Sequence, residues 1–451
     1  MGIFSLFSNS FAHGVHPAHH KGPTEDLKIQ RVPFGKRYVM PLGQHIGAPA
    51  TPVVSKGQIV RRGELIAKPG AFVSTSLHSP VTGTIREISP QRTLDGALKE
   101  AIVIEADPYS TQQLETTPPP SWEKLSLEAF IDVIQQAGIV GMGGAAFPSH
   151  VKYSLPDGVA INDLLINGAE CEPFLTNDHR LMVERPETVI EGTEILRQKL
   201  GAKRACIGIE QNKPEAIERL QQHLDQHPEL AAIRLIPLEV KYPQGAEKML
   251  IQSVYGKEVP AGQLPRDVGI AVNNVGTIVA IADLFKTGSP LIERIVTVSG
   301  PGVDQPANLL VPLGTSVRDV LQFAGGLSEK TREIIMGGPM MGFPIASLDV
   351  PILKGSSGIL AFTEQETARP TEYPCIRCGR CLEACPYFLN PSRLALLSRY
   401  RRYEETTEHH VMDCVECGAC SYACPSNIPI TQLIRTAKDN LRQHPLEQQA
   451  A

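Results

Sequence analysis

Apolar residues in the first quarter of the chain occur in short runs that glycines separate. The runs lie at positions 58–60, 64–67, 84–88 and 101–105, and glycines stand at 57, 63, 70 and 83. Short apolar runs bounded by glycine turns are typical of β-strands in an all-β unit. The pattern therefore predicts an N-terminal all-β unit over residues 1–115.

A second pattern begins after a linker at 111–120, which is rich in Thr, Gln and Pro and has no apolar period. Ser126 is followed by an acidic residue and by apolar residues at helical spacing, and Gly138 ends the run. These signals predict a helix over 126–137. Apolar strands at 164–167 and 270–273 follow, each leading into polar residues. Residues 121–288 are therefore expected to form an α/β unit.

The remaining pattern changes from strands to helices. Residues 295–300, 309–321 and 333–337 indicate a strand, a strand followed by a helix, and a strand, which predicts a β-rich unit over 289–363. After a linker at 364–374, apolar residues recur at helical spacing in 393–400 and 430–438. They predict a helical unit over 370–445. The whole chain is expected to be a multidomain protein of α/β and α+β class.

Composition limits the classes of partner. The 451 residues are 42% hydrophobic and 20% charged, as in ordinary globular proteins, and the formal net charge is −5. This balance argues against a nucleic-acid partner. The sequence has no run of 18 apolar residues, so no transmembrane helix is expected. The start Met1-Gly-Ile-Phe lacks the basic region and the cleavage site of a signal peptide.

Eight of the ten cysteines form two copies of C-x₂-C-x₂-C-x₃-C-P near the C-terminus. This spacing is that of bacterial proteins with two 4Fe–4S clusters, in which the fourth cysteine of each copy ligates the other cluster. The two predicted ligand sets are Cys375, Cys378, Cys381 and Cys424, and Cys414, Cys417, Cys420 and Cys385. Such oxygen-sensitive clusters imply a reducing cytoplasm.

Other roles for the cysteines and histidines fit less well. Zinc sites usually combine two C-x₂-C pairs, and dense disulfides belong to short secreted chains. Cys206 lies in an apolar strand and Cys171 in a polar turn, and both are expected to be structural. Histidines at positions 13, 16, 19 and 20 have no cysteine or carboxylate among them, so we expect an ordinary N-terminal arm rather than a metal site.

A glycine-rich loop follows the predicted first helix, with Gly138, Gly141, Gly143 and Gly144 ahead of Lys152. Glycines let backbone N–H groups approach phosphate oxygens, and a lysine adds positive charge. The loop matches neither the dinucleotide fingerprint nor a Walker loop, so a tight structural turn remains an equal alternative on these residues alone.

Three further motifs, taken in order, resemble the flavin- and NADH-binding subunit of respiratory complex I. They are the acidic motif 167–173, the segment 242–250 and the strand and turn 270–277. The resemblance implies an FMN site made by Gly141, Gly143, Lys152, Asn167, Asn273, Asn274 and Thr277, with Gly144 and Glu170 in the same motifs. It also implies NADH stacked on the flavin near Phe147, with Glu172 and Glu247 as the catalytic pair.

The chain departs from that family at several positions. Val140 and Met142 stand where the family has arginines, Ala169 replaces an aspartate, and Ala246 replaces a glutamate. Each change removes a charged contact at the expected nucleotide site.

Two flanking units resemble known modules. Residues 54–67 with 78–85 are similar to the biotinyl/lipoyl barrel-sandwich domain, but Phe72 stands near the carrier lysine's position and 71–79 contain no lysine. A structural or docking role is therefore expected in place of a swinging arm. Residues 289–363 resemble the soluble-ligand-binding β-grasp module, for which we favour a packing role.

The four units in this order resemble the C subunits of Rnf (or Rsx) electron transport complexes. The resemblance implies a peripheral subunit on the cytoplasmic face of the bacterial inner membrane. It would exchange hydride between NAD(H) and FMN and single electrons with two 4Fe–4S clusters. Membrane subunits of the complex, and ferredoxin or a ferredoxin-like subunit, would be its partners.

Two other functions remain open. A soluble flavin/iron–sulfur reductase, similar to the cobalamin reductase of microcompartments, would work without a membrane complex, although that family begins directly at the flavin domain. A wiring or docking subunit without nucleotide chemistry would explain the lost charges at positions 140, 142, 169 and 246.

Overall fold

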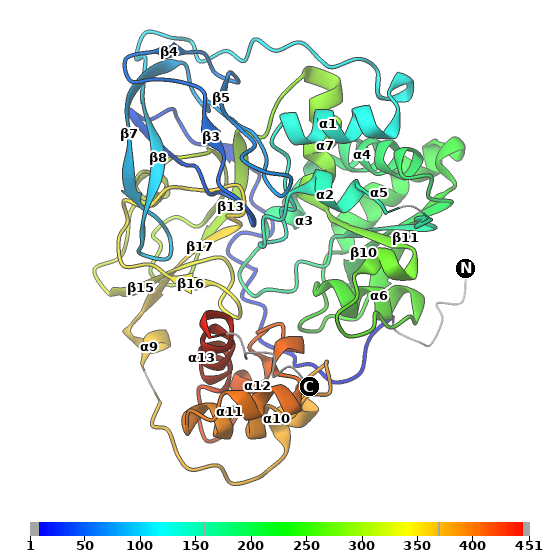
Figure 1. The fold of residues 1–451 in the computed structure, drawn as a ribbon, viewed down its shortest axis with the longest axis vertical. Coiled ribbons are helices and arrows are strands. Elements are labelled where there is room, and N and C mark those ends of the chain that lie inside the picture. The colour runs from blue at the N-terminus through cyan, green and yellow to red at the C-terminus, as the bar shows by residue number, and fades with distance from the viewer. Residues whose placement is uncertain (1–8, 157, 369, 445–451) are drawn as a thin grey trace.

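The computed structural model describes residues 9–156, 158–368 and 370–444. Residues 1–8 of the expected first unit and residue 445 of the expected last unit lie outside the described residues. Figure 1 shows three units in an upper group above a small helical one. An antiparallel barrel unit and a mixed-sheet unit lie on the left, a parallel-sheet unit lies on the right, and the cysteine-rich helical unit lies at the bottom.

The barrel unit (residues 37–106) contains two small antiparallel sheets packed around one core. One sheet has the order β2 (Arg37–Pro41), β8 (Leu98–Ala106), β7 (Gly83–Arg92), β4 (Ile59–Val60), and the other β3 (Thr51–Pro52), β5 (Leu65–Lys68), β6 (Leu77–His78). Phe72, at the predicted carrier position, is 63% exposed, and its carbonyl lies 2.8 Å from Nε2 of His150 in the next unit. The barrel therefore contacts the next unit at this position, and its expected structural or docking role stays a prediction.

The parallel-sheet unit (residues 122–287) has four parallel strands in the order β11–β10–β9–β12. Ser126 caps the first helix as predicted, since its Oγ accepts from the Ala129 N–H at 3.1 Å, and Gly138 follows with a φ of +74°. The elements are η1 (Trp122–Lys124), α1 (Leu127–Gln136), α2 (Ser149–Tyr153), β9 (Asp163–Asn167), α3 (Asn177–Glu184), α4 (Pro186–Lys199), β10 (Arg204–Glu210), α5 (Pro214–Gln226), η2 (Pro228–Leu230), β11 (Ile233–Leu238), α6 (Glu247–Tyr255), η3 (Pro265–Val268), β12 (Ile270–Asn274) and α7 (Val275–Thr287).

The mixed-sheet unit (residues 293–363) carries one six-stranded sheet, in the order β1–β14–β13–β17–β15–β16, to which residues near the N-terminus contribute β1 (Gln30–Arg31). Its other elements are β13 (Glu293–Ser299), β14 (Ala307–Pro312), α8 (Val317–Phe323), β15 (Thr331–Met336), β16 (Phe343–Pro344) and β17 (Gly358–Thr363). A short helix, α9 (Glu364–Thr367), lies within the segment predicted to be a linker.

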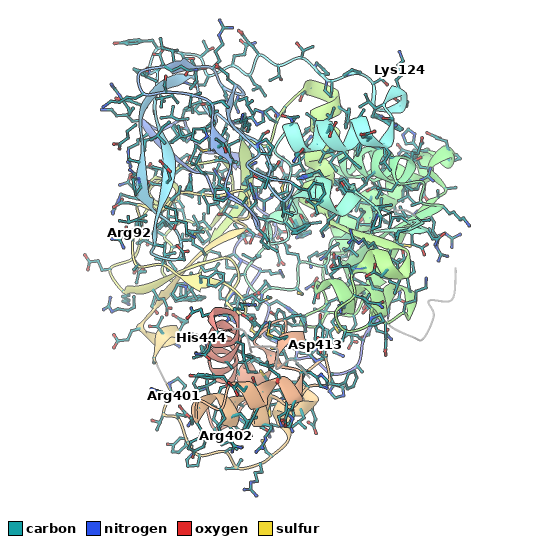
Figure 2. The ribbon with its side chains drawn as sticks, viewed as in Figure 1. Arg92, Lys124, Arg401, Arg402, Asp413 and His444 are labelled. Atoms are coloured by element: carbon teal, nitrogen blue, oxygen red, sulfur yellow. The ribbon has the colours of Figure 1, made fainter. Side chains whose placement is uncertain are left out.

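The cysteine-rich unit (residues 370–444) is helical, as the apolar period predicted. Its elements are α10 (Arg380–Glu383), α11 (Pro391–Arg399), η4 (Glu404–His409), η5 (Val411–Asp413), α12 (Ala419–Tyr422) and α13 (Ile430–Gln443). Arg401 and Arg402 lie at its outer, lower end, whereas Asp413 and His444 lie at its upper side in this view (Figure 2).

Residues 9–31, which we call the N-terminal strap, precede the barrel strands within the expected first unit (residues 1–115) and contact other units. Val15 pairs with Tyr242 of the parallel-sheet unit, and His13 Nδ1 lies 3.0 Å from the Leu382 carbonyl of the cysteine-rich unit. Farther on, β1 joins β14 in the mixed sheet. The strap therefore touches three units before the barrel begins.

Helices of the described residues are all too short or too polar to cross a membrane.

Candidate functional site: a nucleotide site beside a cluster site

The predicted nucleotide motifs meet at the carboxyl edge of the parallel sheet. β9 and β12 are neighbours in register, so that Asn167 pairs with Asn274 at their ends. Asn274 also caps α7, because its Oδ1 accepts from the Gly276 N–H at 2.8 Å. Ligands of parallel sheets bind at this edge, and a helix N-terminus favours anions.

The glycine-rich loop (residues 138–147) lies across this edge and is fastened to α7. Met142 N–H donates to Thr277 Oγ1 at 2.9 Å, and the Thr277 hydroxyl donates to the Val140 carbonyl at 3.2 Å. A Cβ placed on Gly143 would lie 3.7 Å from Asn274 Cβ, and one on Gly144 would meet nothing within 4 Å. The structure thus brings the glycines, Asn274 and Thr277 together, with the open side of the loop facing outward.

Lys152 lies at the same edge, where its ammonium is 3.2 Å from Glu247 Oε1 and 3.3 Å from the Val272 carbonyl. Tyr153, which sequence reasoning missed, is buried and donates its hydroxyl to Asn273 Oδ1 at 2.8 Å. Burial raises the pKa of Tyr153, which keeps this hydroxyl a donor. The only sequence signal for it was its place next to Lys152.

The acidic motif (residues 167–173) is joined to the segment before α6. Asn167 Nδ2 donates to the Gly245 carbonyl at 2.8 Å, and the Gly245 N–H donates to Cys171 Sγ at 3.2 Å. Burial raises the pKa of the Cys171 thiol, so it stays protonated and matches the expected structural role. Glu247 follows directly in α6, beside Lys152.

Glu170 is buried and is held by a cation from outside the motif. Its carboxylate accepts from the Asp178 N–H at 2.6 Å, and burial raises its pKa to about 7. Lys21 of the strap donates to the carbonyls of Glu170 and Glu172 at 2.9 and 3.0 Å, and also to that of Leu175. Nothing in the sequence pattern indicated that an N-terminal lysine would reach this motif.

Glu172 bonds away from the glycine-rich loop. Its two carboxylate oxygens accept from the N–H groups of Met340 and Met341, both at 3.0 Å, in the loop of residues 337–342 of the mixed-sheet unit. Burial raises the pKa of Glu172 to about 7. Phe147 is half-buried, and its carbonyl accepts from the Gly141 N–H at 2.8 Å.

These residues fit a flavin nucleotide. Asn273 Nδ2 is buried and has no hydrogen-bond partner among the described residues. The Gly143 and Gly144 N–H groups likewise donate to no described residue, and both glycines are exposed. Free donors beside a lysine and a capped helix N-terminus suit a phosphate and a heterocycle rich in acceptors.

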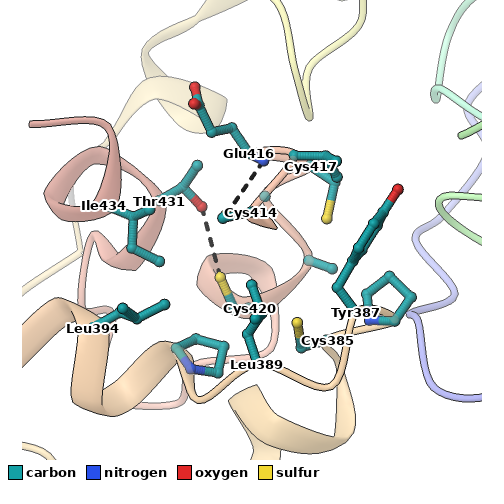
Figure 3. Close-up of a pocket in the computed structure, with 15 residues that line it drawn as sticks. Cys385, Tyr387, Leu389, Leu394, Cys414, Glu416, Cys417, Cys420, Thr431 and Ile434 are labelled. Atoms are coloured by element: carbon teal, nitrogen blue, oxygen red, sulfur yellow. Dashed lines mark hydrogen bonds between the residues drawn. The ribbon is translucent and has the colours of Figure 1, made fainter. Parts of the chain in front are cut away.

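Four of the predicted cluster ligands face one cavity. Figure 3 shows Cys385, Cys414, Cys417 and Cys420 converging on a space that Tyr387 and hydrophobic residues enclose. Cys385 comes from the first motif, and the other three come from the second. The four cysteines of this predicted crossed set therefore line one cavity, and their ligation of one cluster stays a prediction.

The two motifs adopt matching backbones, which suits two similar clusters. Gly379 and Gly418 have φ angles of +79° and +83° and precede α10 and α12. The N–H groups of Arg377 and Glu416 each lie 3.4 Å from the Sγ of the cysteine two residues earlier.

In the part of the chain that the structure describes, no group of three or more His, Cys, Asp or Glu side chains is spaced for a single metal ion.

The cluster cavity lies against the nucleotide motifs. The Tyr242 hydroxyl donates to the Cys417 carbonyl at 2.7 Å, and Tyr242 packs with Cys171 and Met340. A Cβ on Gly418 would lie 2.9 Å from the Met340 carbonyl, so this glycine permits the close approach of the 337–342 loop. Cys375, by contrast, is exposed.

A flavin-type nucleotide site joined to a two-cluster cysteine unit defines an electron-transfer protein. Family models agree unit by unit: the RnfC barrel sandwich hybrid domain matches 9–109, the Nuo51 FMN-binding domain 134–283, the SLBB domain 295–344 and the 4Fe–4S dicluster domain 374–428. The chain belongs to the family of C subunits of ion-translocating ferredoxin:NAD⁺ oxidoreductase complexes.

Three relatives, each the C subunit of its own complex, show how far this similarity reaches. The one from the proton-translocating ferredoxin:NAD⁺ oxidoreductase complex of Clostridium ljungdahlii is 46% identical over 96% of this chain and 94% of its own. The counterpart from the Na⁺-translocating complex of Acetobacterium woodii is 38% identical over 95% and 96%. The counterpart from the ion-translocating oxidoreductase complex of Pseudomonas aeruginosa is 41% identical over 96% of this chain but 56% of its own.

Among solved structures, an NAD⁺-reducing [NiFe]-hydrogenase in the air-oxidized state aligns with 72% of this chain and 62% of its own chain. The TM-score is 0.51 at 20% identity, a likeness of fold alone.

Proposed function

We propose that this chain exchanges hydride between NAD(H) and FMN, and single electrons with two 4Fe–4S clusters, within an ion-translocating ferredoxin:NAD⁺ oxidoreductase complex. The observation that carries the proposal is the contact between Tyr242 and Cys417. It joins the segment next to the flavin motif directly to the backbone of a predicted cluster ligand. Two redox sites that share such a contact suit an internal electron relay.

The protein residues in this scheme bind and orient. When bound, FMN supplies the change between two-electron and one-electron chemistry. The Gly143 and Gly144 N–H groups and the α7 N-terminus offer donors to a phosphate, and Asn273 Nδ2 offers a donor beside them. Lys152, paired with Glu247 at the edge, supplies positive charge. We propose that NAD(H) binds near Phe147, Glu172 and Glu247.

The two cluster sites have different surroundings, which suggests an entry and an exit. The site of Cys385, Cys414, Cys417 and Cys420 lies against the nucleotide unit. Cys375 and Cys378 of the other site are exposed. An exposed cluster suits transfer to another protein, so we propose membrane subunits of the complex, or a ferredoxin-like protein, as partners there. Such docking would place the chain at the cytoplasmic face of the inner membrane.

The wiring alternative has one observation in its favour. Val140 and Met142, which replace arginines of the resembling family, are buried in the glycine-rich loop and leave it without cations of its own. The soluble-reductase alternative is less well supported, because the barrel that such reductases lack matches the RnfC family model.

An anaerobic NADH titration of the reconstituted full chain tests the proposal. Flavin absorbance and the cluster EPR signals are followed together. Bleaching of the flavin with reduction of the clusters supports the relay. Intact clusters beside a flavin that is absent or indifferent to NADH would refute it and favour the wiring function.

A further inference from the structure

The glycine-rich loop is backed by two buried cations from a different unit. Lys354 Nζ donates to the Gly138 carbonyl at 2.6 Å and to the Ser76 carbonyl of the barrel at 2.7 Å. Arg294, in β13, donates from Nη2 to the Met142 carbonyl at 3.3 Å. Both cations thus hold carbonyls of the loop from the side opposite its open face.

Arg294 is unusual for a buried arginine. The residue is 4% exposed, and its hydrogen bonds within the described chain go to no carboxylate. Its guanidinium bonds to the Ser356 carbonyl at 3.1 Å and to the Met142 carbonyl, and it lies against Met142 Sδ, which is a weak acceptor. Burial lowers the pKa of Arg294 to about 10, and the Asp178 carboxylate, which accepts from Asn274 Nδ2 at 2.7 Å, partly opposes this shift without forming an ion pair with Arg294. Buried charges normally have an ionic partner within hydrogen-bonding distance, and the described residues give Arg294 none, so it can still pair with an anion.

Arg294 lies beside the N-terminus of α7, one of the proposed donors to the phosphate. Its Nη1 lies 3.3 Å from where a Cβ on Gly276 would be, in the first turn of α7. Because a trans peptide places its C=O and N–H on opposite sides, a Met142 carbonyl held by Arg294 directs the next N–H, that of Gly143, toward the open face. That N–H donates to no described residue.

We propose that Arg294, contributed by the mixed-sheet unit, is the positioning residue for the FMN phosphate and takes the place of the arginines missing at positions 140 and 142. It fixes the Gly143 N–H toward the ligand and supplies positive charge from behind the loop. The mixed-sheet unit is then part of the flavin site and more than a spacer. This inference rests on the proposed function, because it requires an FMN site at the loop.

The experiment compares FMN with riboflavin, which lacks the phosphate. The full chain with reconstituted clusters is freed of flavin and titrated anaerobically with each ligand, using quenching of flavin fluorescence. Arg294→Met is expected to weaken FMN binding by about ten- to a hundredfold, the effect of losing a charge-assisted contact, and to change riboflavin binding little. Arg318→Met, at an exposed arginine of the same unit, is the matched control.

Two further variants separate charge from structure. Arg294→Lys keeps a cation and should retain part of the preference for FMN. In the double variant Met142→Arg/Arg294→Met, the charge returns from the loop side and should restore that preference.

Each outcome decides the matter. Equal losses of FMN and riboflavin in Arg294→Met would show a merely structural role, and an unchanged FMN affinity would show none, so either result overturns the inference. If Arg294→Met does not fold, a lysine variant with no preference for FMN overturns it as well. Failure of the unaltered protein to bind FMN would instead refute the proposed function on which the inference rests.

Discussion

Replacing Glu172 with glutamine should change how stability depends on pH. Burial raises the pKa of this carboxyl from 4.5 to about 7, although two backbone N–H groups favour its charged form. A group whose folded pKa is raised stabilises the fold fully below its unfolded pKa, and that stability is lost as the pH rises through the folded value. With a pKa of 4.5 in the unfolded chain and about 7 in the folded one, the free energy of unfolding falls by about 1.4 kcal/mol between pH 6 and pH 8.

Glutamine cannot ionise, so Glu172→Gln should lack this part of the pH dependence. The substitution also replaces one of the two carboxylate oxygens, which accept from the Met340 and Met341 N–H groups, by an NH₂ group, which is a donor. The lost hydrogen bond lowers the free energy of unfolding by about 1–3 kcal/mol at every pH. The variant should therefore be less stable at pH 6, and its deficit should shrink by about 1.4 kcal/mol at pH 8.

Thermal unfolding followed by circular dichroism, under anaerobic conditions at both pH values, measures the two deficits. A change of 1.4 kcal/mol corresponds to about 3–6 °C in midpoint for a unit of this size. Glu329→Gln, at an exposed carboxylate of the mixed-sheet unit that Glu172 contacts, controls for the loss of one negative charge. Parallel pH profiles for Glu172→Gln and the unaltered chain would refute the reasoning, because they would mean that Glu172 does not titrate in this range.

Three other changes have expected outcomes. Cys385→Ser should remove about half of the bound iron, measured by iron analysis, and the EPR signal of the cluster that the second motif ligates. Cys171→Ser, as a control, should leave the iron content unchanged. Loss of the other cluster in Cys385→Ser would contradict crossed ligation. Tyr242→Phe should lower the free energy of unfolding by about 1 kcal/mol in denaturant titrations, since it removes one hydrogen bond to the Cys417 carbonyl, and an unaltered stability would show that this contact is not maintained. Burial lowers the pKa of Lys354 to about 7, so between pH 7 and pH 9 the unfolded chain binds more protons than the folded one and the free energy of unfolding rises with pH. Lys354→Met should flatten this rise in denaturant titrations. A rise that persists in the variant would contradict the prediction.

Local patterns were enough to predict much of this molecule. The crossed ligation of the two cysteine motifs stays a prediction from their known spacing. The cap at Ser126 and the strands at the flavin motifs follow from spacing within a few residues. Each depends on backbone geometry that neighbours along the chain determine, so the sequence contains the signal directly.

Contacts between units were not predictable in this way. Lys21 and Arg294 are single cations in segments with no motif, and their importance comes from where distant strands place them. The role of Glu172 depends on the Met340 and Met341 N–H groups, which carry no side-chain signature at all. Whether a single charged residue is buried depends on how the units pack together, so the pattern of apolar and polar residues along the chain cannot predict it.

The N-terminal strap has a consequence for biosynthesis. It leaves the ribosome before the units that it contacts, and its contact at His13 is with a carbonyl 369 residues later in the chain. At about 5–20 residues per second, translation needs about 20–70 s to cover that distance. The strap can therefore pair with Tyr242 and β14 earlier, but its contact with the cysteine-rich unit forms only when synthesis is nearly finished. That contact is therefore a late step of maturation.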